Sequence, residues 1–180
     1  MPVQTGRQFP YLEFRRRHVL ETPAPVVWPW ETLAGELAAA EHSEYGTLTL
    51  AGPDGGHEIV PGTSMTFQSV RPGERTTPHA HSWWHLYFVR SGSGVLVLDE
   101  TDETAELSDG DVLLIPAWWA HHFENRGTEG DLLLLNMSNL PQQAALHNKF
   151  SREGIRAGRT TVEGAAAAPP LSPHPQVSGA

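Results

Sequence analysis

Short apolar or alternating segments recur along the middle of the chain at intervals of roughly ten residues. Each is bounded by Gly, Pro, Asp or Asn, residue types that end strands and open turns. No long amphipathic helix separates the segments, so the pattern favours an antiparallel sandwich or barrel over βαβ units. The segments are YGTLTL (45–50), SMTFQSV (64–70), HLYFV (85–89), GVLVLDE (94–100), DVLLIP (111–116) and DLLLLNM (131–137).

The regions on either side of these segments differ from them in composition and pattern. Glu31–His42 is rich in Ala, Leu and Glu, which predicts a short helix, and Pro141–Phe150 begins with a proline suited to the first helical turn. The last residues consist largely of Ala, Gly, Pro and Ser and cannot bury enough apolar surface to fold. The predicted segments are an N-terminal arm with a short helix (1–44), a β-sandwich (45–140), a C-terminal helix and extension (141–156) and a disordered tail (157–180).

Composition excludes several classes of protein. The 180 residues include no Cys, which removes disulfide scaffolds, Fe–S clusters, Cys-ligated zinc and thiol nucleophiles. A formal net charge of −9 makes nucleic acid an unfavourable partner. No apolar run is long enough to span a membrane and no secretory signal is visible, so a cytoplasmic protein is expected.

Ten histidines are many for this length, and two stretches concentrate them. In the first, residues 73–94, three histidines share odd parity and so share one face of an extended segment. The second, residues 110–125, places a histidine pair after a Pro-bounded turn. Neighbouring strands lie about 5 Å apart, so imidazoles from the two stretches can meet around one metal ion. The histidines concerned are His79, His81, His85, His121 and His122.

These two stretches resemble the paired motifs of the cupins. The first motif is matched by Gly73, His79, His81 and Gly92, and the second by Gly110, Pro116, His121 and Asn125. Two positions depart from the usual pattern, since His85 stands where cupins usually have Glu, and Trp118 where they usually have Gly. The resemblance implies an all-β fold, a single jelly-roll, or double-stranded β-helix, with one divalent metal between its sheets.

Within the cupins the sequence is most similar to gentisate 1,2-dioxygenase-like ring-cleaving enzymes, which hold Fe(II) with histidines alone. That similarity implies a dioxygenase acting on a small hydroxylated or carboxylated aromatic substrate with O2. Those enzymes usually carry two cupin units, whereas this chain has one. Single-unit relatives leave open a non-redox zinc enzyme, such as a cyclase or isomerase, and a metal-supported binding or sensor protein. Analogy with other cupins suggests a homodimer.

Roles for individual residues follow from the motifs and from strand parity. The expected metal ligands are His79, His81 and His121, with His85 as a fourth ligand or else a donor behind the ligands or a substrate contact. His122 points the other way and is left out. Trp83 and Trp119 are expected to wall a substrate pocket, or else to pack in the core. Parity places Arg75 and Tyr87 on the ligand face, Arg75 as a carboxylate clamp and Tyr87 as a hydrogen-bond donor to substrate or a core residue.

Overall fold

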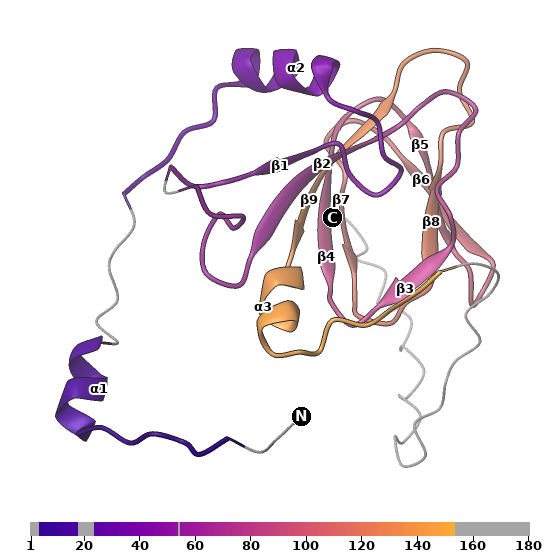
Figure 1. Ribbon diagram of the computed structural model, residues 1–180. Helices are drawn as coiled ribbons and strands as arrows, with labels where there is room; N and C mark the ends of the chain where they lie inside the picture. The colour runs from indigo at the N-terminus through magenta and orange to yellow at the C-terminus, as the bar shows by residue number, and fades with distance from the viewer. Residues whose placement is uncertain (1–3, 18–23, 54, 154–180) are drawn as a thin grey trace, which may run out of the picture.

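The computed structural model describes residues 4–17, 24–53 and 55–153, and its body is a sandwich of two antiparallel sheets (Figure 1). Each sheet has five strands. The first sheet is ordered β1 (Leu48–Leu50), β2 (Ser64–Val70), β9 (Leu132–Ser138), β4 (His85–Ser91) and β7 (Val112–Ile115). The second is ordered β10 (Ser151–Glu153), β3 (His79–His81), β8 (His121–Glu124), β5 (Gly94–Leu98) and β6 (Glu103–Leu107). The predicted all-β jelly-roll is thereby confirmed.

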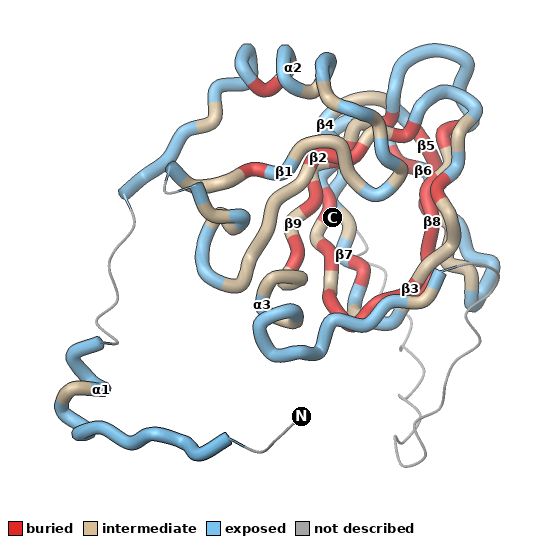
Figure 2. The backbone as a smooth tube through the Cα atoms, in the orientation of Figure 1, coloured by how far each residue is buried: buried red, intermediate tan, exposed pale blue. Residues whose placement is uncertain are grey.

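The main core lies between the two sheets, where the buried backbone of β4, β8 and β9 is concentrated (Figure 2). In β9 every second residue is buried, as expected for a strand with one face toward the core. The buried cluster combines side chains of both sheets: Val70, Tyr87, Val89, Leu96, Leu107, Ile115, Phe123, Leu132 and Leu134. This apolar cluster fixes which face of each strand points inward.

A second, smaller cluster covers the outer face of the first sheet. Helix α2 (Trp30–Ala39) places Leu33 against Leu50 and Phe67, whose side chains point away from the main core. Two further helices, α1 (Tyr11–Arg17) and α3 (Leu140–Ala145), bury no residue fully. Among the described residues, no helix is long and apolar enough to cross a membrane.

The predicted elements differ from the observed ones in identifiable places. The α2 helix ends before the predicted His42, and the helix predicted over Pro141–Phe150 stops at Ala145, after which the chain returns as strand β10 beside β3. Strand β6 was missed because its sequence, ETAEL, is largely exposed and lacks an apolar alternation. Helix α1 was not predicted either. The predicted tail, 157–180, lies outside the described residues.

Candidate metal centre

Three histidines converge on the inner face of the second sheet. Strands β3 and β8 pair directly at His79 and His121, and His81 lies two residues further along β3 on the same face. The potential ligand nitrogens of these three residues all lie within 4.8 Å of one another. His81 and His121 are buried and His79 is partly buried. The structure therefore brings together three of the four predicted metal ligands.

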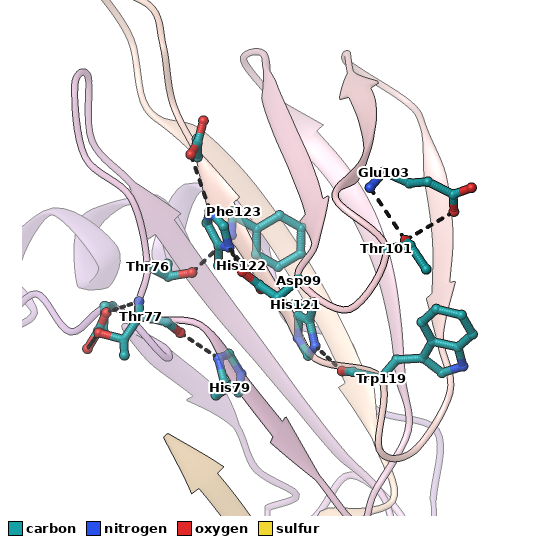
Figure 3. Close-up of polar contacts among 12 residues, drawn as sticks. Thr76, Thr77, His79, Asp99, Thr101, Glu103, Trp119, His121, His122 and Phe123 are labelled. Carbon is teal, nitrogen blue, oxygen red and sulfur yellow. Dashed lines mark hydrogen bonds and ion pairs between the residues drawn. The ribbon is translucent and has the colours of Figure 1, made fainter. Parts of the chain in front are cut away.

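Each of the three imidazoles is held through Nδ1 by a backbone carbonyl. His79 bonds to the Thr77 oxygen at 2.9 Å and His121 to the Trp119 oxygen at 2.9 Å, as Figure 3 shows, and His81 bonds to the Trp83 oxygen at 2.7 Å. A carbonyl oxygen can only accept a hydrogen bond, so Nδ1 carries the hydrogen and Nε2 carries the lone pair. This arrangement orients metal-binding histidines and fixes their tautomer.

Burial keeps these imidazoles neutral. It lowers the pKa of His81 to about 4, lowers the pKa of His121 well below its ordinary value, and also lowers that of His79. The Nε2 atom of His121 is buried and has no hydrogen-bond partner among the described residues. A buried polar atom without a partner is costly, whereas a transition metal binds a neutral imidazole lone pair directly. The residues present therefore fit a divalent transition metal.

His85 approaches this group from the other sheet. Its Nε2 lies 3.0 Å from Nε2 of His81 and accepts a hydrogen bond from the indole nitrogen of Trp83 at 3.0 Å. Its Nδ1 lies 2.6 Å from Oδ1 of Asn136, which can only accept, so Nδ1 carries the hydrogen. The compact group of ligand nitrogens does not include His85. Its lone pair is directed at Trp83 and His81.

The tryptophans near the motifs have different surroundings. Trp83 is buried and stacks on His81, with ring centroids 4.1 Å apart and planes within 7°. Trp119 packs against the main core, and Figure 3 shows its indole directed away from His79 and His121. Trp118 has an exposed ring and a positive φ of 69°, a backbone conformation that favours glycine. This backbone conformation explains why the second cupin motif usually has glycine at the position of Trp118.

The two residues expected to act on substrate, Arg75 and Tyr87, lie in different places in the structure. Arg75 pairs with Glu124, whereas His79 pairs with His121, so the register shifts by one residue between the two pairs. A one-residue shift turns side chains to the opposite face, and Arg75 is exposed on the outer face with Glu124. Tyr87 lies in the main core under His85, with ring centroids 5.1 Å apart, and burial raises its pKa.

A short N-terminal segment, His42–Gly46, also reaches the centre and was not foreseen. The Tyr45 ring contacts His79 edge-on, with centroids 5.1 Å apart, and the Glu44 carboxylate accepts hydrogen bonds from the backbone nitrogen and hydroxyl of Thr77. His42 contacts Glu74 at 2.9 Å. The apolar alternation of YGTLTL indicated only a strand, and no local pattern reveals that its first residue lies on a histidine.

The wall opposite the three imidazoles is polar but uncharged. On β2 and β9 the residues that alternate with the outward Met65, Phe67, Leu133 and Leu135 point inward. Val70, Leu132 and Leu134 among them belong to the main core. The inward residues that remain are Ser64, Thr66, Gln68, Asn136 and Ser138, and three of them, Gln68, Asn136 and Ser138, are buried. Gln68 donates to the Glu44 carbonyl at 2.6 Å, while its Oε1 is buried without a partner among the described residues.

Comparison with known families agrees with this geometry. Residues 66–138, from β2 to the end of β9, match the sequence profile of the cupin domain. This segment is a cupin domain. The matched segment carries His79, His81, His85 and His121, so the whole histidine group belongs to the cupin domain.

Curated relatives carry dioxygenase names. The chain is 28% identical over 148 residues to a gentisate 1,2-dioxygenase of Ralstonia sp, covering 75% of this chain and 41% of that protein. It is 28% identical over 126 residues to a 1-hydroxy-2-naphthoate 1,2-dioxygenase of Nocardioides sp. (strain KP7), covering 67% of this chain and 32% of that protein. The chain therefore spans less than half the length of these relatives.

A solved structure gives the same picture of the fold. Salicylate 1,2-dioxygenase from Pseudoaminobacter salicylatoxidans, in adducts with gentisate, superposes with a TM-score of 0.62 at 20% sequence identity. The superposition covers 70% of this chain and 36% of that one. At this identity the likeness establishes the cupin fold.

Proposed function

We propose that this cupin is a metal-dependent dioxygenase that cleaves the ring of a small hydroxylated aromatic compound. In the proposed reaction both atoms of O2 enter the product as one ring carbon–carbon bond breaks, so no external reductant is needed. The observation that carries the proposal is the group of three neutral imidazoles, two of them buried, whose Nε2 atoms converge. The dioxygenase names of the relatives support the reaction class.

Fe(II) is the proposed metal, held by His79, His81 and His121. Imidazole suits iron, and three nitrogen ligands leave positions of an octahedral ion open for other molecules. When bound, the iron would supply the place where the substrate oxygens and O2 exchange electrons. Because the three ligands are neutral, a phenolate oxygen of the substrate would offset the charge of the ion.

The protein itself orients the reactants and excludes water. The carbonyls of Thr77, Trp83 and Trp119 keep the three lone pairs convergent before anything binds, so little reorganisation is required. Stacking of Trp83 on His81 restricts that ring and lines the buried side of the group. Tyr45, which is partly exposed beside His79, lies where a ligand would enter.

The test combines metal analysis with oxygen uptake. Protein expressed and purified without oxygen is analysed for bound metals, and O2 consumption is then followed with hydroxybenzoates and hydroxynaphthoates and with the corresponding phenols and diols. Iron-dependent uptake with a ring-opened product supports the proposal, and the His79→Ala variant should abolish both. Retention of zinc with no uptake on any compound would contradict it.

A second function, a zinc-dependent cyclase or isomerase without redox chemistry, is favoured by one observation. His85 supplies a fourth imidazole 3.0 Å from His81, and four neutral nitrogen donors suit Zn2+ as well as iron. There the ion would act as a Lewis acid on a substrate carbonyl. The same metal analysis separates the two functions, because this one requires no O2.

We also propose that the protein acts in the cytoplasm and forms a homodimer, and the homodimer is what its resemblance to other cupins implies. Light scattering of the purified protein measures the assembly, and a mass equal to one chain would contradict the dimer. Oligomers of this kind are most often symmetric pairs.

A further inference from the structure

We infer that the ligand of this metal centre is an uncharged aromatic compound that offers adjacent hydroxyl or carbonyl oxygens and carries no carboxylate. The inference rests on the proposed function and narrows its substrate class. It depends on three features of the described residues. The wall facing the imidazoles is uncharged, the Arg and Lys side chains near the sandwich point away from the metal centre, and the buried Oε1 atom of Gln68 has no hydrogen-bond donor.

The wall facing the imidazoles contains amide and hydroxyl groups only. Ser64 and Ser138 bond to each other at 3.0 Å, and Thr66 pairs across the sheet with Asn136. Such groups form neutral hydrogen bonds with hydroxyl and carbonyl oxygens. Proteins that recognise carboxylates commonly use the planar fork of arginine, and no inward position of β2, β4 or β9 at this end holds one.

The cationic side chains near the sandwich point away from the centre. Arg152 pairs with Ala80, which faces opposite to His79 and His81, and its guanidinium lies 5.8 Å from the exposed Trp118 ring. Arg90 lies over Trp30 on the outside of the first sheet, at 4.4 Å. The remaining ones between residues 55 and 153 are exposed: Arg71, Arg75, Arg126 and Lys149. Arg75 is turned outward by the register shift.

The charges that do lie near the centre are negative. Glu153 pairs with His79 across the second sheet, and the Glu44 carboxylate accepts a hydrogen bond from Thr77, the residue whose carbonyl holds the His79 ring. These carboxylates would attract a metal cation and repel an anionic ligand. An additional carboxylate on the ligand would therefore meet no cation apart from the ion itself.

Gln68 indicates what the ligand must donate. Its amide nitrogen faces the carbonyl of Glu44, which can only accept, so the assignment of Oε1 as the free atom is fixed by the hydrogen bond. Oε1 is buried and lacks a partner among the described residues. A hydroxyl group of a ligand can donate to it, whereas an ionised carboxylate cannot.

The experiment compares catechol with salicylate, which differ by a hydroxyl in place of a carboxylate. Binding to zinc-loaded wild-type protein is measured without oxygen by isothermal titration calorimetry, and the same compounds with free Zn2+ in the same buffer give the intrinsic preference of the ion. We expect the protein to favour catechol over salicylate by at least about tenfold more than free Zn2+ does. An equal preference, or tighter binding of salicylate, would overturn the inference and leave the proposed function standing.

A matched pair of variants tests the role of Gln68. Gln68→Met should weaken catechol binding by about tenfold, whereas Gln142→Met, at an exposed position of α3, should leave it unchanged. Should Gln68→Met fail to fold, the wild-type comparison still decides. Failure of both compounds to bind a protein that retains its zinc would overturn the proposed function and this inference with it.

Discussion

The Nε2 atoms of His81 and His85 lie 3.0 Å apart although the two residues belong to different sheets. Both rings carry their hydrogen on Nδ1, where His81 donates to the Trp83 carbonyl and His85 to Asn136. Two lone pairs therefore face each other. Metal–nitrogen bonds of about 2.1 Å place adjacent ligands of an octahedral ion about 3.0 Å apart, so a shared cation would relieve this contact.

The first prediction concerns metal retention in histidine variants. His79→Ala and His121→Ala each remove a member of the convergent group and should lose most of the bound metal. His85→Ala should lose less, because the His85 lone pair already accepts from Trp83. Elemental analysis after dialysis gives the metal content, and His57→Ala, at an exposed position, is the control. Equal retention in all three variants would show that the ligand assignment is wrong.

The second prediction separates the two roles of Trp83. Trp83→Phe removes the indole N–H that occupies His85 but retains a ring to stack on His81. The freed lone pair should tighten metal binding by up to about tenfold, the worth of one neutral hydrogen bond. Competition with a chromogenic chelator measures the affinity. Weaker binding in this variant would mean that Trp83 orients His85 for ligation, and Trp83→Ala serves to show the effect of losing the stack.

Much of the metal centre could be predicted because its ligands lie close together in the sequence, in two short motifs. The spacing of His79 and His81 places them on one face of a strand, and the second motif places His121 in the strand that pairs with it. The position of Arg75 could not be predicted from parity, because one extra residue between two strand pairs turns it outward. Tyr45 was likewise missed, since its contact with His79 joins segments far apart in the chain.

In the fold, too, the elements that local sequence determines were predicted, and those that depend on distant partners were not. Strands with an apolar alternation, such as β2, or an apolar run, such as β9, were predicted close to their observed limits, while β6 has four exposed residues of five and gave no signal. Strand β10 was not predicted, and its residues fall in the extension after the predicted helix, because these three residues form a strand only by pairing with β3. Patterns of burial therefore predict central strands, whereas edge strands depend on their partners.

The third prediction compares two glycines of the cupin motifs. Gly92 and Gly110 both have a positive φ, 88° and 89°, but a Cβ on Gly92 would lie 2.2 Å from the Asp131 carbonyl oxygen, whereas one on Gly110 meets nothing within 4 Å. Gly110→Ala should lower the free energy of unfolding by about 1 kcal/mol through backbone strain alone. Gly92→Ala should cost clearly more. Urea unfolding measures both, and similar losses would contradict the predicted clash.

The fourth prediction uses the strained backbone of Trp118. With φ at 69°, steric strain between Cβ and the backbone lowers the free energy of unfolding by about 1–2 kcal/mol for any residue other than glycine. Trp118→Ala and Trp118→Gly both lose the contact with Arg152, so comparing them isolates the strain. We expect the glycine variant to be more stable than the alanine variant by about 1 kcal/mol in thermal or urea unfolding. An alanine variant of equal stability would mean that the backbone relaxes there.

The last prediction concerns Glu74, which ties the segment carrying Tyr45 to the sandwich. Burial alone would raise the pKa of Glu74, but hydrogen bonds from the Arg71 backbone nitrogen and from His42 outweigh it, and the pKa is lowered. A lowered folded-state pKa means that the unfolded chain binds protons first as the pH falls. The stabilisation is therefore complete above the unfolded value of about 4.3 and is lost as the pH falls through the folded value.

Glu74→Gln should accordingly reduce the free energy of unfolding at neutral pH, by less than about 1 kcal/mol because the side chain is partly exposed. The difference from wild type should shrink at the lowest pH at which both proteins still fold reversibly. Urea unfolding at the two pH values measures it, with the exposed Glu129→Gln as the control. A difference that grows on acidification would have the wrong sign for a carboxylate stabilised in its ionised form.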